Sequence, residues 1–155
     1  NYLPKYMTPV CAWVRVGDYL VAPVYAYPVS IGHAEDLAKE HGCELPTPKL
    51  VDAIWKAADL RIPPPTRSHN GTIKEMANRE VFEDQRKRID AAIGGQVFQL
   101  LAGTHKDVVR CPNTGRVGLY GWHSLDGKPI QPPFYGHSRD WIDYSQGLRL
   151  VRKAV

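Results

Sequence analysis

The hydrophobic periodicity of the chain changes at Gly94 and Gly95, and this change limits the folds that the chain can adopt. Between Ser30 and the two glycines, apolar residues recur at the three- and four-residue spacing of helices. After them, short β-branched and aromatic runs are separated by turn residues. Regular alternation of strand and helix is absent, so a parallel α/β fold is not favoured. The order predicts an α+β fold: an N-terminal strand pair, three helices and a mainly antiparallel C-terminal β-sheet.

Local signals place the first elements. Residues 11–27 alternate apolar and polar positions on either side of Gly17 and Asp18, which is typical of two short strands joined by a tight turn. Ser30 is a typical N-cap residue, and apolar residues follow it at helical spacing. Thr47 is the predicted cap of a second helix, which begins with a proline. We therefore expect a hairpin followed by two amphipathic helices.

The third predicted helix is long and mostly exposed. Thr72 and Glu75 have capping-box spacing, and the pattern continues to Ile93. Beyond it, four strand candidates are separated by turns: "VFQLLAG", "KDVVR", "RVGLYGW" and "GLRLVRK". With 155 residues the whole chain, 1–155, is expected to form a single domain.

Composition excludes several classes of protein. The chain is 43% hydrophobic and 23% charged, and no apolar run reaches the roughly 18 residues that span a membrane. Its net charge of +4 would favour an anionic partner, but the basic residues are scattered among acids, so we expect no nucleic-acid partner. The three cysteines are widely spaced, which favours free thiols over disulfides or a zinc ribbon. We expect a monomer without a membrane span.

The segment from Thr104 to Asp107 is the first candidate for chemistry. Alternation along the strand that follows predicts His105 and Asp107 on one face of the sheet and Lys106 on the other. A carboxylate beside an imidazole raises its pKa and orients it, as acid–base catalysis requires. The alternative is a polar strand end exposed to solvent.

The second candidate is "YGWHSLDGKPIQPPFYGHSRDWIDYSQGLRL", residues 120–150. As a zinc site, His123, His137 and Asp143 or Asp140 would provide three ligands and leave one position for water. As an acyl-transfer site, Ser145 would be the nucleophile, although the G-x-S-x-G elbow is missing. The spacing of these candidate zinc ligands along the sequence matches no known ligand signature.

A binding groove without chemistry is the third interpretation. Aromatic residues of the same segment would offer flat faces to sugar rings or peptide side chains. A purely structural role, with the aromatic residues in the core, is the remaining alternative. The many polar side chains of the segment argue against a purely structural role, because burying so many polar groups without partners is costly. We expect this segment to form one wall of a cleft that residues 104–109 complete from a neighbouring strand.

Several blocks resemble a family of uncharacterised, mostly secreted bacterial proteins. The blocks are "GCELPTPKLVDAIWKAADL", "AGTHKDVV", "RVGLYGWHSLDGKPIQP" and "WIDYSQGLRLV", in the same order as in that family. The resemblance implies a secreted, extracytoplasmic setting and a wall polymer or another extracellular polymer as the substrate and partner. It covers the chain from about Tyr19 to Val151.

The chain departs from the family pattern at two histidines. The family block Gly-His-Lys-Lys-Asp places its histidine on Thr104, and Asp-Tyr-Ser-His-Gly places one on Gln146. A fainter resemblance, to the Ser-His-Gly-Cys-x-Arg block of L,D-transpeptidases, places the nucleophilic cysteine on Leu148. Leucine offers no nucleophile, so thioester chemistry is excluded at that position.

These observations predict a hydrolase or lyase, of secreted or phage origin, that acts on bacterial cell-wall peptidoglycan or a related extracellular polymer through a His/Asp site. The alternative is a non-catalytic module that binds a glycan or peptide in an aromatic cleft. The expected catalytic residues are His123, His137, Asp107, Asp143 and His105. The expected substrate-binding residues are Tyr144, Ser145, Trp122, Trp141 and Lys106. A metal, zinc if any, would be held by His123, His137 and Asp143.

Overall fold

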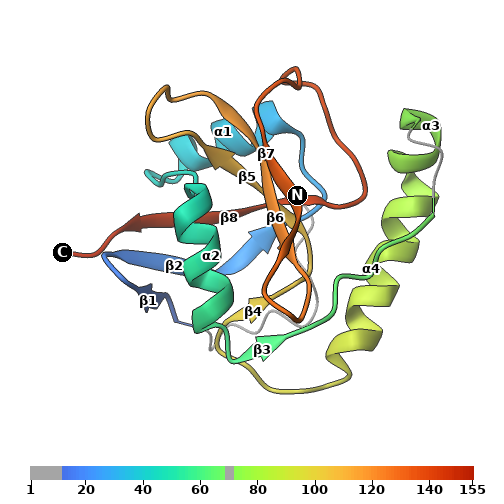
Figure 1. Cartoon of the computed structure of the whole chain (residues 1–155), viewed down its shortest axis with the longest axis horizontal. Helices are drawn as coiled ribbons and strands as arrows, with labels where there is room; N and C mark the ends of the chain where they lie inside the picture. The colour runs from blue at the N-terminus through green and yellow to red at the C-terminus, as the bar shows by residue number, and fades with distance from the viewer. Residues whose placement is uncertain (1–11, 69–71) are drawn as a thin grey trace.

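The computed structural model describes residues 12–68 and 72–155 (Figure 1). Its elements are β1 (Val14–Val16), β2 (Tyr19–Ala26), α1 (Ile31–Glu40), α2 (Pro48–Ala57), β3 (Leu60–Arg61), α3 (Ile73–Met76), α4 (Arg79–Ile93), β4 (Leu101–Ala102), β5 (Lys106–Arg110), β6 (Val117–His123), β7 (Pro129–Phe134) and β8 (Gln146–Lys153).

Six strands form one sheet in the order β1-β2-β8-β5-β6-β7. All neighbours in it are antiparallel except β5 and β8, which are parallel. The short strands β3 and β4 form a separate parallel pair. The predicted α+β class, with its N-terminal strand pair and mostly antiparallel sheet, is confirmed. No helix in the described ranges is long and apolar enough to cross a membrane.

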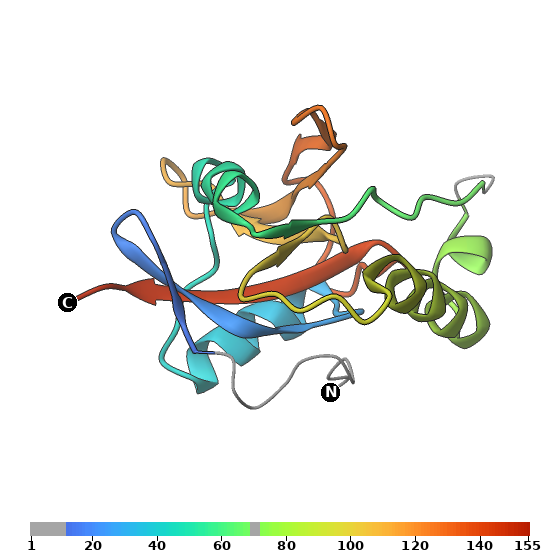
Figure 2. The ribbon, with the colours of Figure 1, turned by 90° about the horizontal axis from the view of Figure 1, so that it is seen from below.

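The two helices α1 and α2 cover opposite faces of the sheet (Figure 2). On the α1 face, Leu37 belongs to a buried cluster with Val108 and Leu148. On the α2 face, Ile54 belongs to a cluster with Val21 and Val151. Because successive side chains of a strand point to opposite faces, neighbouring residues of β5 and β8 face different layers. This division between faces positions the candidate site.

The hairpin and the first two helices form as predicted. The hairpin turns at Gly17, whose φ of 58° lies in the left-handed region that glycine adopts without strain. The Ser30 hydroxyl accepts a hydrogen bond from His33 N at 3.2 Å. The Thr47 hydroxyl accepts one from Leu50 N at 3.3 Å. Both helices therefore begin at the predicted caps.

The prediction of one continuous third helix from Thr72 to Ile93 is wrong, because the segment forms α3 and α4. Asn78 has an extended backbone, and its side-chain oxygen accepts a hydrogen bond from Val81 N at 3.0 Å. An asparagine side chain that bonds the backbone nearby competes with helix continuation and caps a new helix. The predicted end at Gly94 is confirmed, since Gly94 is left-handed with φ 57°.

Two further strand predictions need correction. Residues 129–134 carry three prolines and are not among the strand candidates, but they form β7, an edge strand, where missing N–H donors are tolerated. In "VFQLLAG" only Leu101 and Ala102 form a strand. The Asp59 carboxylate accepts hydrogen bonds from Gln99 N and Leu100 N at 2.9 and 2.7 Å, and these bonds take the place of strand pairing.

Candidate functional site

The sheet divides the ten predicted site residues between two hollows. The larger hollow, called the cleft below, has a volume of about 410 Å³ and is lined by Thr66, Arg67, Met76, Lys106, Trp122, Ile130, Gln131, His137, Trp141, Asp143, Tyr144 and Ser145. The smaller, called the small pocket, has a volume of about 20 Å³ and is lined by Val51, Ile54, Trp55, Ala102, Gly103, Thr104, His105, Asp107, Trp122, His123 and Arg149. Seven of the ten residues line the cleft, and Trp122 lines both.

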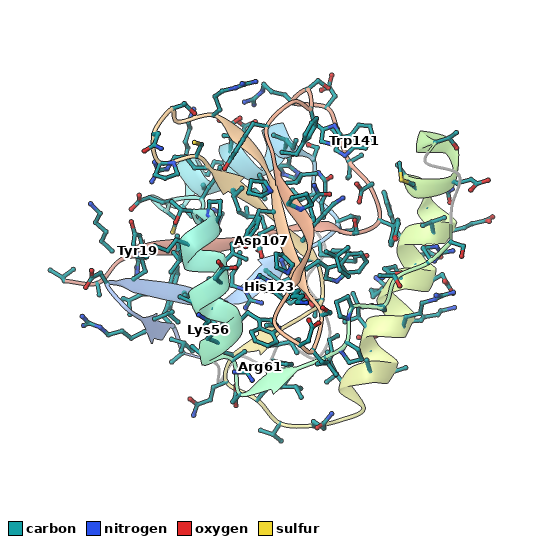
Figure 3. All side chains as sticks on the ribbon, viewed as in Figure 1. Tyr19, Lys56, Arg61, Asp107, His123 and Trp141 are labelled. Atoms are coloured by element: carbon teal, nitrogen blue, oxygen red, sulfur yellow. The ribbon has the colours of Figure 1, made fainter. Side chains whose placement is uncertain are left out.

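The division follows from alternation along β5. Asp107 faces α2 and lines the small pocket, whereas Lys106 lines the cleft on the other side. Figure 3 shows Asp107 and His123 beside α2 near the centre of the molecule, with Trp141 away from them on the loop that precedes β8. The predicted opposition of His105 and Asp107 to Lys106 is confirmed. The cleft also joins residues of the 120–150 segment to Lys106, as expected.

A largely buried ion pair lines the cleft. Lys106 Nζ lies 3.0 Å from Asp143 Oδ2, and their side chains are only 12% and 3% exposed. Asp143 Oδ1 accepts hydrogen bonds from Ser145 N at 2.8 Å and Ser145 Oγ at 2.5 Å. Burial alone would raise the pKa of Asp143, but the charge of Lys106 and the Ser145 hydrogen bonds hold it below its ordinary value. Asp143 is therefore ionised, and both of its carboxylate oxygens have partners.

His137 lies in the cleft against an aromatic wall. Its imidazole is parallel to the Trp141 indole, with ring centroids 4.0 Å apart and planes 8° from parallel, and it contacts Phe134 edge-on. Burial and then the positive charge of Lys106 lower the pKa of His137, although Asp143 opposes this effect. The imidazole is therefore mostly neutral near pH 7 and able to accept a proton.

Arg67 and Met76, which the sequence did not single out, also line the cleft. Arg67 lies at 5.8 Å from the ring centroid of Tyr144 and pairs with Asp84 at 2.6 Å. The carbonyl of Met76 accepts a hydrogen bond from Tyr144 N at 2.7 Å, which joins α3 to the loop before β8. The hydroxyl of Tyr27 donates to the Tyr144 carbonyl. Arg67 belongs to a proline-rich loop whose composition carried no signal for this placement.

His123 lies in the small pocket with an acidic partner from α2. Its Nε2 is 2.7 Å from Asp52 Oδ1, and its ring stacks on Trp55 with centroids 5.6 Å apart. The Tyr120 hydroxyl donates to the same Asp52 oxygen at 2.7 Å. Burial, with the Asp52 hydrogen bond and charge, raises the pKa of Tyr120 to about 12. Neither Asp52 nor Trp55 is among the site residues that the sequence predicts.

His105 is held on both sides of its ring. Its Nδ1 lies 2.6 Å from Thr104 Oγ1, and its Nε2 lies 3.1 Å from Asp107 Oδ1. The ring stacks against Tyr25 with centroids 4.8 Å apart. The predicted pairing of His105 with Asp107 is present, but neither nitrogen is left for a substrate. This geometry gives His105 a positioning role.

The structure does not bring the predicted metal ligands together. His123 lies in the small pocket, whereas His137 and Asp143 line the cleft. Within residues 12–68 and 72–155, no three His, Cys, Asp or Glu side chains are grouped to hold a metal ion. The acyl-transfer arrangement is altered too, because the Ser145 hydroxyl donates to Asp143. The serine thus belongs to a Ser-Asp-Lys network.

The two positions at which the resemblances place a histidine and a cysteine are structural here. The Gln146 amide nitrogen donates to the carbonyls of Val29 and Trp141 at 2.8 and 2.9 Å. It therefore anchors the loop that carries Trp141. Leu148 is 1% exposed and packs in the α1-side core. Neither side chain lines the cleft or the small pocket.

The chain matches no protein-family model, no curated protein and no solved structure.

Proposed function

We propose that the chain is a hydrolase or lyase that acts on bacterial cell-wall peptidoglycan or a related extracellular polymer, with the cleft as its active site. One observation carries the proposal: a mostly neutral imidazole, His137, lies beside the ionised Lys106–Asp143 pair in a cleft of about 410 Å³. That volume is typical of a ligand site. A neutral base beside a fixed positive charge is an arrangement that acid–base chemistry uses.

Each group has a separate part in the proposed reaction. His137 accepts a proton from the attacking water or from the substrate carbon, and returns it to the leaving oxygen or nitrogen. The Lys106 ammonium stabilises negative charge that develops on the substrate, and Asp143 holds Lys106 and Ser145 in position. Trp141 presents aromatic surface to the polymer, and Tyr144, which is only 4% exposed, supports the cleft wall from behind. The extracellular setting rests on the resemblance of the sequence blocks.

A non-catalytic binding module is the second candidate. The parallel stack of His137 on Trp141 favours it, because the stack holds both aromatic rings in place in the cleft, and an aromatic face suits a sugar ring or a peptide side chain. In that case Lys106 and Arg67 would orient a bound polymer without reaction. The two candidates share the cleft and differ only in turnover.

Digestion of purified cell walls tests the proposal. Wild-type protein should release soluble fragments, and His137→Gln should lose at least about 100-fold in rate, the usual contribution of a general acid or base. The matched control is His33→Gln, an exposed histidine on α1, which should retain the wild-type rate. Fragment masses separate the two reactions, since a hydrolase adds one water per cleavage and a lyase adds none.

Three outcomes are informative. Equal rates for wild type and His137→Gln would exclude His137 from the reaction. No fragments, together with retention of the protein on sedimented walls, would favour the binding module. Neither fragments nor retention would contradict both candidates for this polymer.

A further inference from the structure

The two basic residues that line the cleft differ in how their charges are balanced. Among the described lining residues, the fully charged ones are Arg67, Lys106 and Asp143. Lys106 and Asp143 lie 3.0 Å apart and neutralise each other. The acidic partner of Arg67, which is Asp84, does not line the cleft. The lining therefore carries one net positive charge, and that charge lies on Arg67.

Asp84 compensates Arg67 only in part, because it also pairs with Arg88. Asp84 Oδ2 lies 2.6 Å from Arg67 Nη1 and 2.9 Å from Arg88 Nε. One carboxylate between two guanidinium groups leaves one positive charge over the three side chains. Arg67 is 20% exposed, whereas Arg88 is 47% exposed. Water therefore screens the attraction of an anion to Arg67 less than the attraction to Arg88.

The guanidinium of Arg67 has an open edge. Its Nη1 donates to Asp84, and no side chain or carbonyl within residues 12–68 and 72–155 accepts a hydrogen bond from its Nε or Nη2. These two nitrogens hold parallel N–H donors, which match the two oxygens of a carboxylate. A neutral carbonyl or hydroxyl of a substrate would leave the positive charge of Arg67 uncompensated.

Contacts of the surrounding loop hold Arg67 in place. Its backbone N–H donates to the Tyr144 hydroxyl, and its guanidinium carbon lies 5.8 Å from the centroid of the Tyr144 ring. The loop is also tied to α4, since Gln85 Nε2 donates to the Pro65 carbonyl. A side chain that is already held in position loses less conformational entropy when it binds a ligand.

We propose that the cleft recognises a carboxylate of its polymer substrate and that Arg67 binds this carboxylate through Nε and Nη2. One net positive charge in the lining matches a monoanion. The carboxylate belongs either to an acidic sugar or to a peptide, which share this chemistry. This assignment rests on the proposed function in one respect, the binding of the polymer in the cleft.

NMR titration with two matched pairs of probes tests the site. The sugar pair is N-acetylmuramic acid and its carboxamide, and the peptide pair is N-acetylalanylalanine and its carboxamide. The wild type should bind at least one acid about tenfold more tightly than the matching carboxamide, because hydrogen bonds to a charged group contribute that factor or more. Preference in the sugar pair alone supports an acidic sugar, and preference in the peptide pair alone supports a peptide. Preference in both pairs supports recognition of the carboxylate itself.

Variants of one residue locate the bound carboxylate. Arg67→Gln should bind the acid as weakly as the wild type binds the carboxamide, with the affinity for the carboxamide unchanged. Arg67→Lys keeps the charge without the paired donors, so its preference should fall about threefold, and it decides the test if Arg67→Gln does not fold. The matched control is Arg79→Gln, an exposed arginine of α4 paired with Glu83, which should keep the full preference.

Three results would overturn the carboxylate site: equal binding of acid and carboxamide by the wild type, an undiminished preference in the Arg67 variants, or binding of no probe. Cell-wall digestion that requires His137, without any preference for the acids, would retain the proposed function and overturn only the carboxylate site. Preference for an acid that is lost in Arg67→Gln, without digestion, would support the carboxylate site and contradict the proposed reaction.

Discussion

Lys106 and Asp143 form an ion pair, with 3.0 Å between Nζ and Oδ2, across the junction of β5 and the loop before β8. Both side chains are largely buried. Removing one member of such a pair leaves an uncompensated charge in a region of low dielectric constant. The pair therefore links the stability of the protein to the geometry of the cleft.

The first prediction concerns this pair. Lys106→Met should lower the free energy of unfolding by about 3 kcal/mol at neutral pH, because Asp143 would remain charged and buried without its partner. Urea denaturation followed by fluorescence measures the change. The matched control is Lys56→Met, an exposed lysine on α2, which should change stability by less than about 0.5 kcal/mol. Equal effects of the two substitutions would mean that the ion pair contributes nothing.

The second prediction concerns acid. The pKa of Asp143 lies below its ordinary value of 3.8 in the folded protein, so the carboxylate binds protons more weakly there than in the unfolded chain. Its contribution to stability is present above about pH 4 and is lost as the pH falls through the folded-state pKa. Stability of the wild type should therefore fall more steeply on acidification below about pH 4 than that of Asp143→Asn. Parallel curves of unfolding free energy against pH would contradict this assignment.

The third prediction concerns Tyr120. Its pKa is raised to about 12 by burial and by the hydrogen bond and charge of Asp52. Asp52→Asn removes the charge, so the pKa should move toward the ordinary 10.0. Ultraviolet absorbance during alkaline titration follows tyrosine ionisation, and Tyr120→Phe identifies the transition. Asp126→Asn, on an exposed turn, should leave it in place, and an unchanged transition in Asp52→Asn would show that burial alone is responsible.

The fourth prediction concerns the backbone beside the small pocket. Gly103 has φ of 98°, and a Cβ there would lie 2.1 Å from the Ile62 carbonyl oxygen. Gly103→Ala should therefore destabilise the fold by at least about 3 kcal/mol. Gly115→Ala is the matched control, because Gly115 also has positive φ, of 72°, but open space around its Cβ. Its cost should be about 1 kcal/mol. Similar costs for both would show that the Ile62 carbonyl can move aside.

The predictions from sequence are wrong at two places. At one, a side-chain hydrogen bond overrides the local pattern, and at the other, the position of a strand in the sheet does. The capping box at Thr72 predicted one helix, but Asn78 began another through its own side chain. The three prolines of residues 129–134 argue against a strand, yet this stretch forms β7 at the sheet edge, where one side of the strand needs no partner. Neither outcome can be obtained from periodicity, because periodicity contains no information about neighbouring strands.

The sequence by itself determined the turns, the caps of α1 and α2, and the opposition of Lys106 to His105 and Asp107. These features depend on hydrogen bonds and alternation within a few residues, such as the Thr47 hydroxyl with Leu50 N.

Only the tertiary structure decided which side chains meet. Asp52 reaches His123 across 71 residues, because α2 packs on the face of the sheet to which the end of β6 points. Insertion of β8 between β2 and β5 brings Asp143 and Ser145 to Lys106 and carries Arg149 to the opposite face. Such contacts follow from strand order and layer packing, which depend on the burial of the whole chain and leave no short-range pattern in the sequence.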